Sequence, residues 1–425
     1  MTLCLLQDRN LIRSRARSAR FALARINAPL APSTYSRPGA DIALVLDRSG
    51  SMSGEKFRLA KQAVEQGIQR LNHKDTFSVV VYDEKVTVVS ESQSATVQAK
   101  RNALSELAMV SPRGTTNLGE GWLTGCGEVA RHLSNERIGR VYLLTDGLAN
   151  VGITDPGALA THARELRMRG VSTSTFGVGE DYDEVLLGQM ADAGGGAFTH
   201  IRHPKEIPAL IDHELGETLE IVARNVTLTI SKQTSVQVTP VGPYPFEETD
   251  YETIIRIPDL VSAQEFELPL RITLPKGIDG DEIFQEVFVS DKDDVLKGKP
   301  LPLGWTWASH EDNDNQPRER DVDYVIAERY AAMAREEAST MNRDGQYGLA
   351  AKRLKQVAKR IAGYAGNDRK LNRIVRGLRR DAETYSHFMS SLDRKASYSS
   401  SLYIARGGTK HSLRKKWSVS PTPKD

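Results

Sequence analysis

Apolar and polar positions follow two different rhythms along the chain. Between residues 41 and 220, short β-branched runs alternate with segments in which apolar residues recur every three or four positions. The strand-like runs are 42–46, 77–82, 141–144, 171–178 and 197–201. The helical segments are 57–71, 95–107, 119–133, 156–169, 183–193 and 204–222. This alternation predicts an α/β domain over residues 40–222. Its doubly wound, mostly parallel sheet has helices on both faces, and residues 86–89 add an antiparallel edge strand.

The pattern changes to a period of two after residue 222. Short alternating runs rich in Val, Ile and Thr are separated by prolines through residues 223–307, which predicts a small antiparallel β-sandwich. Residues 1–39 hold two more strand-like runs, at 2–7 and 20–28. We therefore expect the N-terminal strands to join the sandwich, so that the α/β domain is inserted in it or followed by it.

The last quarter of the chain is polar and helical by pattern. Residues 308–321 are almost entirely polar and are predicted to be a linker. Residues 322–392 contain three segments with helical spacing, which predicts a helical domain. Residues 393–425 are rich in Ser, Gly and Lys, and we expect a basic, disordered tail.

Composition is that of an ordinary globular protein and excludes several classes. The 425 residues are 39% hydrophobic and 26% charged, and no apolar run approaches the roughly 18 residues of a membrane span. Two cysteines, Cys4 and Cys126, are too few for a disulfide framework and favour free thiols in a reducing compartment. The N-terminal basic residues follow the apolar ones, the reverse of a signal peptide, although an Arg- and Ser-rich transit peptide stays an alternative. We expect a cytoplasmic protein.

The candidate chemistry lies at the ends of two predicted strands. Asp47 ends the run 42–46, and the hydroxyls of Ser49 and Ser51 follow on either side of a glycine. Asp146 ends the run 141–144 in the same way, and Thr116 or its neighbour Thr115 precedes a predicted helix. Because ligands bind outside the carboxyl ends of parallel strands, we expect these groups to converge there. Carboxylate and hydroxyl oxygens suit Mg²⁺, which keeps waters in its other positions.

This order of residues resembles the metal-ion-dependent adhesion site (MIDAS) of von Willebrand factor A (VWA) domains. Thr116 matches the threonine of that site better than Thr115 does. The resemblance covers about residues 40–220 and implies their Rossmann-like fold. It implies that Ser49, Ser51 and Thr116 contact Mg²⁺ (Mn²⁺ and Ca²⁺ being alternatives), with Asp47 and Asp146 acting directly or through water. One open position on the ion would then accept a carboxylate from a partner protein. The competing interpretation is that these residues only cap helices and turns.

A longer resemblance is to bacterial and archaeal proteins that carry a VWA domain between β segments and are often labelled calcium-activated chloride channel homologues. Channel function should not be carried over with this label, because no segment of the sequence is predicted to line a pore. Many cytoplasmic relatives are adaptors of AAA+ ATPases, so the resemblance implies an adaptor with a protein partner, such as an AAA+ ATPase. We find no nucleophile–base pair in the sequence, and an enzyme is not expected.

The charge is unevenly distributed although the net charge is only +2. Between Lys352 and Arg380 there are eleven basic residues and one acid, Asp368. The simplest interpretation is a packed helical bundle with a solvated basic face. The alternative function is a nucleic-acid-associated scaffold that binds through these helices.

Overall fold

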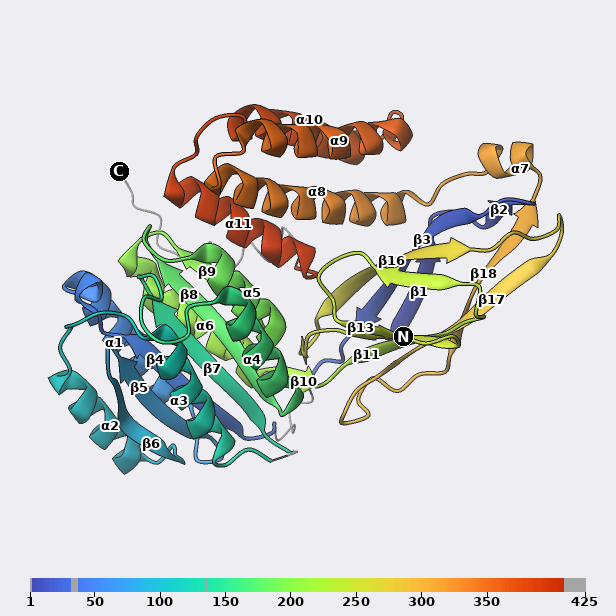
Figure 1. Cartoon of the computed structure of the whole chain (residues 1–425). Coiled ribbons are helices and arrows are strands. Elements are labelled where there is room, and N and C mark those ends of the chain that lie inside the picture. Colours follow the sequence, from blue (N-terminus) through green and yellow to red (C-terminus); the bar gives the residue numbers. More distant parts are fainter. Residues whose placement is uncertain (1, 32–36, 135, 409–425) are drawn as a thin grey trace. The chain divides into compact units, whose positions relative to one another are not determined.

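The computed structural model describes residues 2–31, 37–134 and 136–408 (Figure 1). These residues divide into two compact units. The first, called here the α/β unit, contains residues 37–219 and 390–403. The second, the β/helical unit, contains residues 2–31, 220–389 and 404–408.

The α/β unit is built on a six-stranded sheet with the strand order β6-β5-β4-β7-β8-β9. Its strands are β4 (Ala40–Asp47), β5 (Thr76–Tyr82), β6 (Val86–Ser94), β7 (Ile138–Thr145), β8 (Val171–Val178) and β9 (Gly195–Ile201). All neighbouring pairs are parallel except β5 and β6. Every residue of β4, β5 and β7 is buried, because a sheet covered on both faces has no solvated side. The predicted doubly wound sheet and its antiparallel edge strand are confirmed.

Helices cover both faces of this sheet (Figure 1). They are α1 (Glu55–Arg70), α2 (Val97–Met109), α3 (Leu118–Ala130), α4 (Pro156–Met168), α5 (Glu184–Gly194) and α6 (Ile207–Leu219). Apolar side chains of α3, α4 and α5 share one core with β4, β5 and β7. The last predicted helix was too long: residues 221–223 form β10 (Ile221–Ala223), because their backbone pairs with β15 (Leu260–Val261).

The β/helical unit contains two further sheets that share one hydrophobic core. The first has the order β1-β3-β16-β12 and comprises β1 (Leu3–Gln7), β3 (Ser18–Asn27), β12 (Gln237–Pro240) and β16 (Glu265–Leu274). The second has the order β13-β14-β11-β17-β18-β2 and comprises β2 (Leu11–Arg13), β11 (Thr227–Ser231), β13 (Phe246–Glu248), β14 (Glu252–Arg256), β17 (Glu282–Ser290) and β18 (Leu301–Ala308). Each sheet therefore combines strands that precede residues 40–219 in the sequence with strands that follow them, and β3 pairs with β16 over its whole length.

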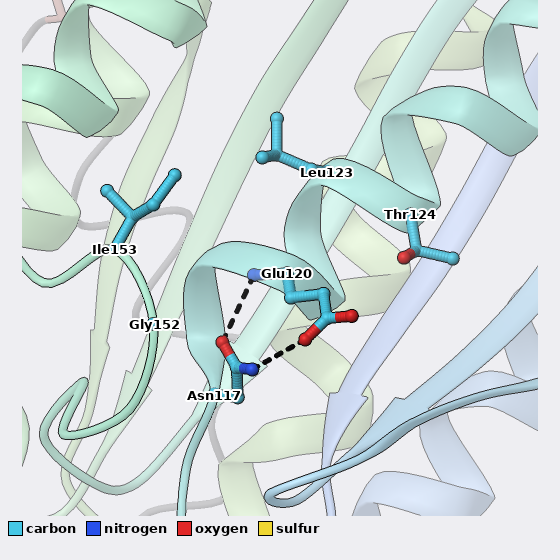
Figure 2. A pocket seen from close by; sticks show the side chains of 6 residues that line it. All are labelled: Asn117, Glu120, Leu123, Thr124, Gly152 and Ile153. Carbon is cyan, nitrogen blue, oxygen red and sulfur yellow. Dashed lines mark hydrogen bonds between the residues drawn. The ribbon is translucent and has the colours of Figure 1, made fainter.

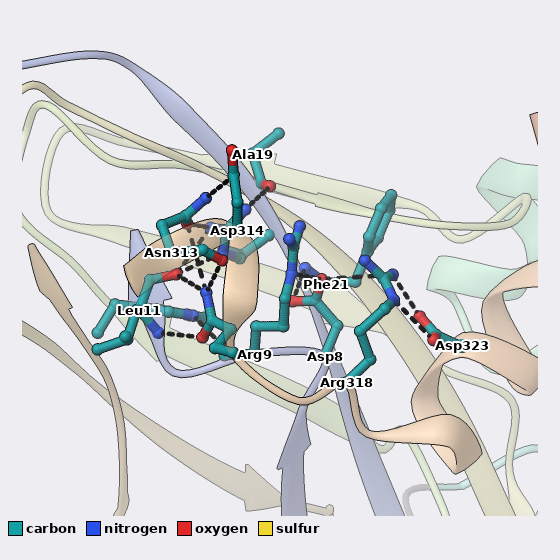
Figure 3. Close-up of polar contacts among 12 residues, drawn as sticks. Asp8, Arg9, Leu11, Ala19, Phe21, Asn313, Asp314, Arg318 and Asp323 are labelled. Atoms are coloured by element: carbon teal, nitrogen blue, oxygen red, sulfur yellow. Dashed lines mark hydrogen bonds and ion pairs between the residues drawn. The ribbon is translucent and has the colours of Figure 1, made fainter. Parts of the chain in front are cut away.

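Residues 308–321 are more ordered than a linker and contain α7 (His310–Asn315). Ser309 caps this helix, and its residues bond to the N-terminal strands (Figure 3). Asn313 accepts a hydrogen bond from Arg20, and Asp314 accepts one of 2.7 Å from Arg13. The prediction of a polar linker was wrong for residues 310–315, which are helical and whose polar side chains have partners about 300 residues away in the sequence.

The three predicted helices of the last quarter are present as α8 (Arg320–Arg343), α9 (Tyr347–Ala365) and α10 (Arg369–Tyr385). Their apolar faces form one core, in which alanines of α8 meet leucine and isoleucine side chains of α9 and α10. No helix in the described part of the chain combines the length and the apolar character that crossing a membrane requires.

The predicted disordered tail is wrong for its first residues, which form α11 (Ser391–Ala405). Residues 391–403 of this helix belong to the α/β unit. Tyr398 and Leu402, four residues apart, lie in the same core as Leu186 and Leu187 of α5. A serine-rich sequence thus becomes a helix because one apolar stripe finds a partner surface. Residues 409–425 lie outside the described part.

A buried polar cluster accompanies this contact. His200 of β9 has no exposed surface, and its Nδ1 lies 2.6 Å from the hydroxyl of Tyr182. The backbone N–H of His200 donates to Ser399 Oγ of α11 over 3.3 Å. Burial lowers the pKa of His200 to about 4. The charges of Lys395 and Arg202 act in the same direction, and that of Glu184 opposes them.

We expect this histidine to make the protein less stable in mild acid. The ordinary pKa of histidine is about 6.5. The unfolded chain therefore takes up a proton as the pH falls from 6.5 towards 4, while folded His200 stays neutral. Its contribution is complete above pH 6.5 and should be about 2 kcal/mol smaller at pH 5. The measurement is the free energy of unfolding at pH 7.5 and pH 5 for the wild type and His200→Gln.

The difference between the two proteins isolates His200, because other titrating groups contribute equally to both. Exposed His132 provides the matched control. For His132→Gln, the difference in unfolding free energy from the wild type should be the same at pH 7.5 and pH 5. The same pH-independent difference for His200→Gln would contradict this interpretation.

Candidate metal centre

The five side chains singled out in the sequence lie at one edge of the α/β sheet. β4 ends at Asp47, and Ser49 and Ser51 lie in the turn between β4 and α1. Asp146 directly follows β7, the parallel neighbour of β4. Thr116 precedes Asn117, which caps the N-terminus of α3.

Hydrogen bonds connect four of the five residues. Asp47 Oδ1 accepts from the backbone N–H of Ser49 over 2.7 Å, which tightens the turn. The hydroxyls of Ser49 and Ser51 are 3.1 Å apart, and Ser51 Oγ donates to Asp146 Oδ1 over 2.6 Å. The two strand ends are therefore joined through serine hydroxyls.

The Thr116 hydroxyl lies close to the Ser51 hydroxyl, beside Gly147. A Cβ atom added to Gly147 would lie 3.3 Å from Thr116 Oγ1 and 3.7 Å from Ser51 Oγ, so the two hydroxyls converge on the space that this glycine leaves open. The backbone N–H of Thr116 donates to Asn150 Oδ1 over 3.0 Å, and Thr116 itself is buried. Thr115, the other candidate, is exposed.

The two carboxylates are buried without a full balance of positive charge. Asp47 and Asp146 are both 0% exposed. Burial raises the pKa of Asp47 to about 6, against the hydrogen bonds from Thr145 and Ser49, and the charge of Asp146 raises it further. Among the described residues, the ion pairs of these carboxylates include a single base, half-buried Lys56, which contacts Asp146 Oδ2. One negative charge is therefore left without a partner.

This set of groups fits a hard divalent cation. It offers two carboxylates and three neutral hydroxyls, the oxygen ligands that Mg²⁺ prefers, and it lacks one unit of positive charge. Exposed Ser51 brings the group to the surface. Nowhere in the described ranges do three or more His, Cys, Asp or Glu side chains form a group that could hold a metal. A metal at this edge therefore depends on the hydroxyls.

Sequence reasoning missed two residues of the site. Thr145 Oγ1 donates to Asp47 Oδ2 over 2.6 Å, so both oxygens of Asp47 are already hydrogen-bonded. Lys56 lies in the first turn of α1, and its Nζ also lies 3.4 Å from the Ser51 carbonyl oxygen. Its position nine residues after Asp47 carries no periodic signal, whereas Thr145 could have been found from its place beside Asp146.

A second set of charges, centred on a buried carboxylate, holds the loops around the site. Asp83, at the turn after β5, is 0% exposed and pairs with Arg48 at 3.0 Å and Arg113 at 2.8 Å. Burial alone would raise its pKa, but hydrogen bonds from Arg113 and the Lys85 backbone, with both arginine charges, keep it below its usual value. The loops before α1 and before α3 are thereby tied to one carboxylate.

A groove of about 440 Å³ is lined by residues that include Asn117, the residue after Thr116 (Figure 2). Asn117, Glu120, Leu123 and Ile153 supply most of its lining. Asn117 donates to Glu120 Oε2 over 2.6 Å, and the Glu120 side chain is exposed. The groove therefore presents an acidic group beside two aliphatic side chains.

Residues 41–213 match the family model described as von Willebrand factor type A domain. A protein of Escherichia coli (strain K12) named "Uncharacterized protein YfbK" is 30% identical over 191 residues, which are 44% of this chain and 33% of that protein. The chain thus spans about a third of the length of this relative.

Two solved structures are similar over nearly the whole chain. The first is a von Willebrand factor type A protein from Catenulispora acidiphila, with a TM-score of 0.73, 18% identity, and coverage of 96% of this chain and 97% of that chain. The second is the ArnB paralog VWA2 from Sulfolobus acidocaldarius, with a TM-score of 0.60, 16% identity, and coverage of 95% and 97%. At these identities the likeness shows the fold alone.

Proposed function

Residues 41–213 of the chain form a von Willebrand factor type A domain, and from this we propose that the protein binds a protein partner through a metal ion in a MIDAS. Ser49, Ser51 and Thr116 hold the ion, with Asp47 and Asp146 supplying negative charge directly or through water. Mg²⁺ is the proposed ion, with Mn²⁺ or Ca²⁺ as alternatives. When bound, the ion supplies a positive charge with an open position for a carboxylate of the partner.

One observation carries this proposal. Three hydroxyls converge at a surface edge over two fully buried carboxylates, and among the ion pairs of the described residues only one of the two, Asp146, is paired with a base, Lys56. Helix capping alone does not explain that arrangement. Asn117 and not Thr116 caps α3, and the hydroxyls of Ser49 and Ser51 make no capping bond to a helix in the described structure.

The surroundings of the site suit a protein surface. VWA domains commonly bind protein partners. Leu148, two residues after Asp146, is 55% exposed and offers an apolar contact beside the metal. The groove with Glu120 suits a basic side chain of the partner that has an aliphatic stem.

The proposal extends to the role of the whole chain. We propose a cytoplasmic, non-catalytic adaptor of the bacterial and archaeal type often labelled calcium-activated chloride channel homologue, without channel activity. An AAA+ ATPase is the class of partner that this type suggests.

The proposed function predicts that partner capture depends on the metal. The bait is the full chain in native lysate, with Mg²⁺ or with chelator, and Ser49→Ala/Ser51→Ala in Mg²⁺. We expect a partner that is retained by the wild type in Mg²⁺ and reduced at least tenfold in the other two samples. Quantitative mass spectrometry of the retained proteins measures this ratio.

The matched control is Ser53→Ala/Ser92→Ala, which removes two hydroxyls outside the site and should retain the partner. Equal capture by all four samples would show that the metal edge is not the binding surface.

A further inference from the structure

The outer face of the α9–α10 hairpin is a basic surface that the proposed function does not use. Seven exposed basic side chains form it, and we call them the basic face: Lys352, Lys355, Lys359, Arg369, Arg373, Arg376 and Arg380. Those on α9 are spaced by three and four residues, and those on α10 by four, three and four. Each set therefore forms a stripe along one side of its helix.

The two stripes point away from the protein core. Leu354 and Ile361 of α9 and Leu371 and Leu378 of α10 are buried in the core shared with α8. At 100° per residue, the basic positions lie on the opposite side of each helix from these leucines and isoleucine. The antiparallel hairpin thus presents both stripes to solvent.

The charges of the basic face are not neutralised within the protein. The ion pairs of the described residues include none of these seven side chains, whereas neighbouring Arg353 pairs with Glu337. α9 contains no acid, and α10 contains two near its C-terminus, of which Asp381 pairs with Arg335 at 2.7 Å. A concentration of unpaired cations costs free energy through mutual repulsion, which a polyanion would relieve.

From this arrangement we infer that the basic face binds the phosphate backbone of a nucleic-acid duplex. The interface with a protein partner would need an apolar centre. Along the basic stripe of each helix, no large apolar side chain lies between the basic residues. A membrane-surface helix would need its apolar face free, and here that face is buried in the core. A row of phosphates needs only the charges, which extend along about 16 Å of α10.

The mode of binding follows from the side chains present. Tyr364 is half-buried, Tyr385 is buried, and exposed Phe388 lies beyond the end of α10, so these three aromatic side chains do not form a platform on which successive single-stranded bases could stack. The contacts are to phosphates, so binding is independent of base sequence and strongly dependent on salt. Duplex binding should also be independent of divalent metal, because none of the seven residues of the basic face is a candidate metal ligand.

The test uses the full chain in chelator and fluorescence anisotropy of a labelled 20-base-pair duplex of mixed sequence. If about five phosphates are contacted, the logarithm of the binding constant should fall with the logarithm of salt concentration with a slope of roughly −4 to −5. Arg373→Gln/Arg376→Gln/Arg380→Gln should weaken binding at least tenfold and make the slope shallower by about 2 to 3. A duplex RNA of the same sequence should show the same losses, because the phosphate backbone is common to both.

The matched control is Arg101→Gln/Arg164→Gln/Arg169→Gln, which removes the same charge from three exposed arginines. Arg101 lies on α2, Arg164 on α4, and Arg169 directly after α4. It should bind the duplex like the wild type, and circular dichroism melting verifies that both variants fold. The inference is overturned if the two triple variants bind the duplex equally. It is also overturned if a polyglutamate peptide or phosphatidylserine vesicles bind as tightly as the duplex with the same loss in the α10 variant.

Discussion

Replacing Glu184 by Gln is expected to lower the free energy of unfolding by several kcal/mol, on the order of 3. Its carboxylate is buried and pairs with Arg394 Nε at 3.0 Å and Lys395 Nζ at 3.1 Å. Burial alone would raise the pKa of Glu184, but the charges of Lys395 and Arg394 outweigh it and keep the pKa below its usual value. Without this carboxylate, two buried cations of α11 lose their counter-charge.

The loss should be concentrated in α11, because Lys395 is only 2% exposed and also donates to the Tyr182 carbonyl oxygen. Denaturant unfolding measures the total change, and hydrogen exchange of the amides of residues 391–403 measures the local one. In the variant, these amides should exchange on the order of a hundredfold faster or more.

Two comparisons give the prediction its control. Glu165→Gln changes an exposed acid of α4 and should alter stability by less than about 0.5 kcal/mol. Lys395→Met in the Glu184→Gln background should restore part of the loss, because it removes a buried cation. If Glu184→Gln is as stable as Glu165→Gln, the buried ion pairs do not hold α11.

The second large effect is expected at the candidate metal centre, where Asp146→Asn should weaken Mg²⁺ binding roughly a hundredfold or more. The proposed hydroxyl ligands are neutral, so Asp47 and Asp146 would supply all the negative charge at the proposed site. Removing one of two charges takes away much of the attraction for a divalent ion, whereas the fold should tolerate the change. Asn keeps the shape of the side chain, and the charge of Asp146 disfavours the ionised form of Asp47.

Lys56→Met should act in the opposite direction at the same site. The Lys56 ammonium occupies Asp146 Oδ2 and repels a divalent ion, so its removal should tighten Mg²⁺ binding about tenfold. Titration calorimetry measures both affinities, and the rise of the melting temperature with Mg²⁺ gives an independent reading.

Asp212→Asn is the matched control, since this carboxylate pairs with Arg70 on the helices α1 and α6, away from the strand ends. It should leave Mg²⁺ binding unchanged. If Asp146→Asn and Asp212→Asn bind Mg²⁺ with the same affinity as the wild type, the ion is not held at this edge.

Much of the α/β unit could be predicted from the sequence because its signals are local. A buried parallel strand is a continuous apolar run, and an amphipathic helix repeats every 3.6 residues, so each element is visible in a window shorter than 20 residues. The five candidate ligands were found for the same reason, since each lies next to the end of such an element and parallel strands end at one edge. The grouping of Asp47 and Asp146 needed only the expectation that their strands are neighbours.

Tertiary structure decided what depends on partners far away in the sequence. Lys395 and Glu184 are 211 residues apart. Their ion pair and the packing of Tyr398 and Leu402 in the core of α5 make a helix of a segment whose composition predicts disorder. Asn313 of the predicted linker is ordered by Arg20 in the same way. Lys56 likewise pairs with Asp146 only because the fold brings the residue after β7 to the first turn of α1. Local pattern determines which elements form because it reports the burial of one face. Which charges are paired is set by the packed fold, because only there do residues distant in sequence come within hydrogen-bonding distance.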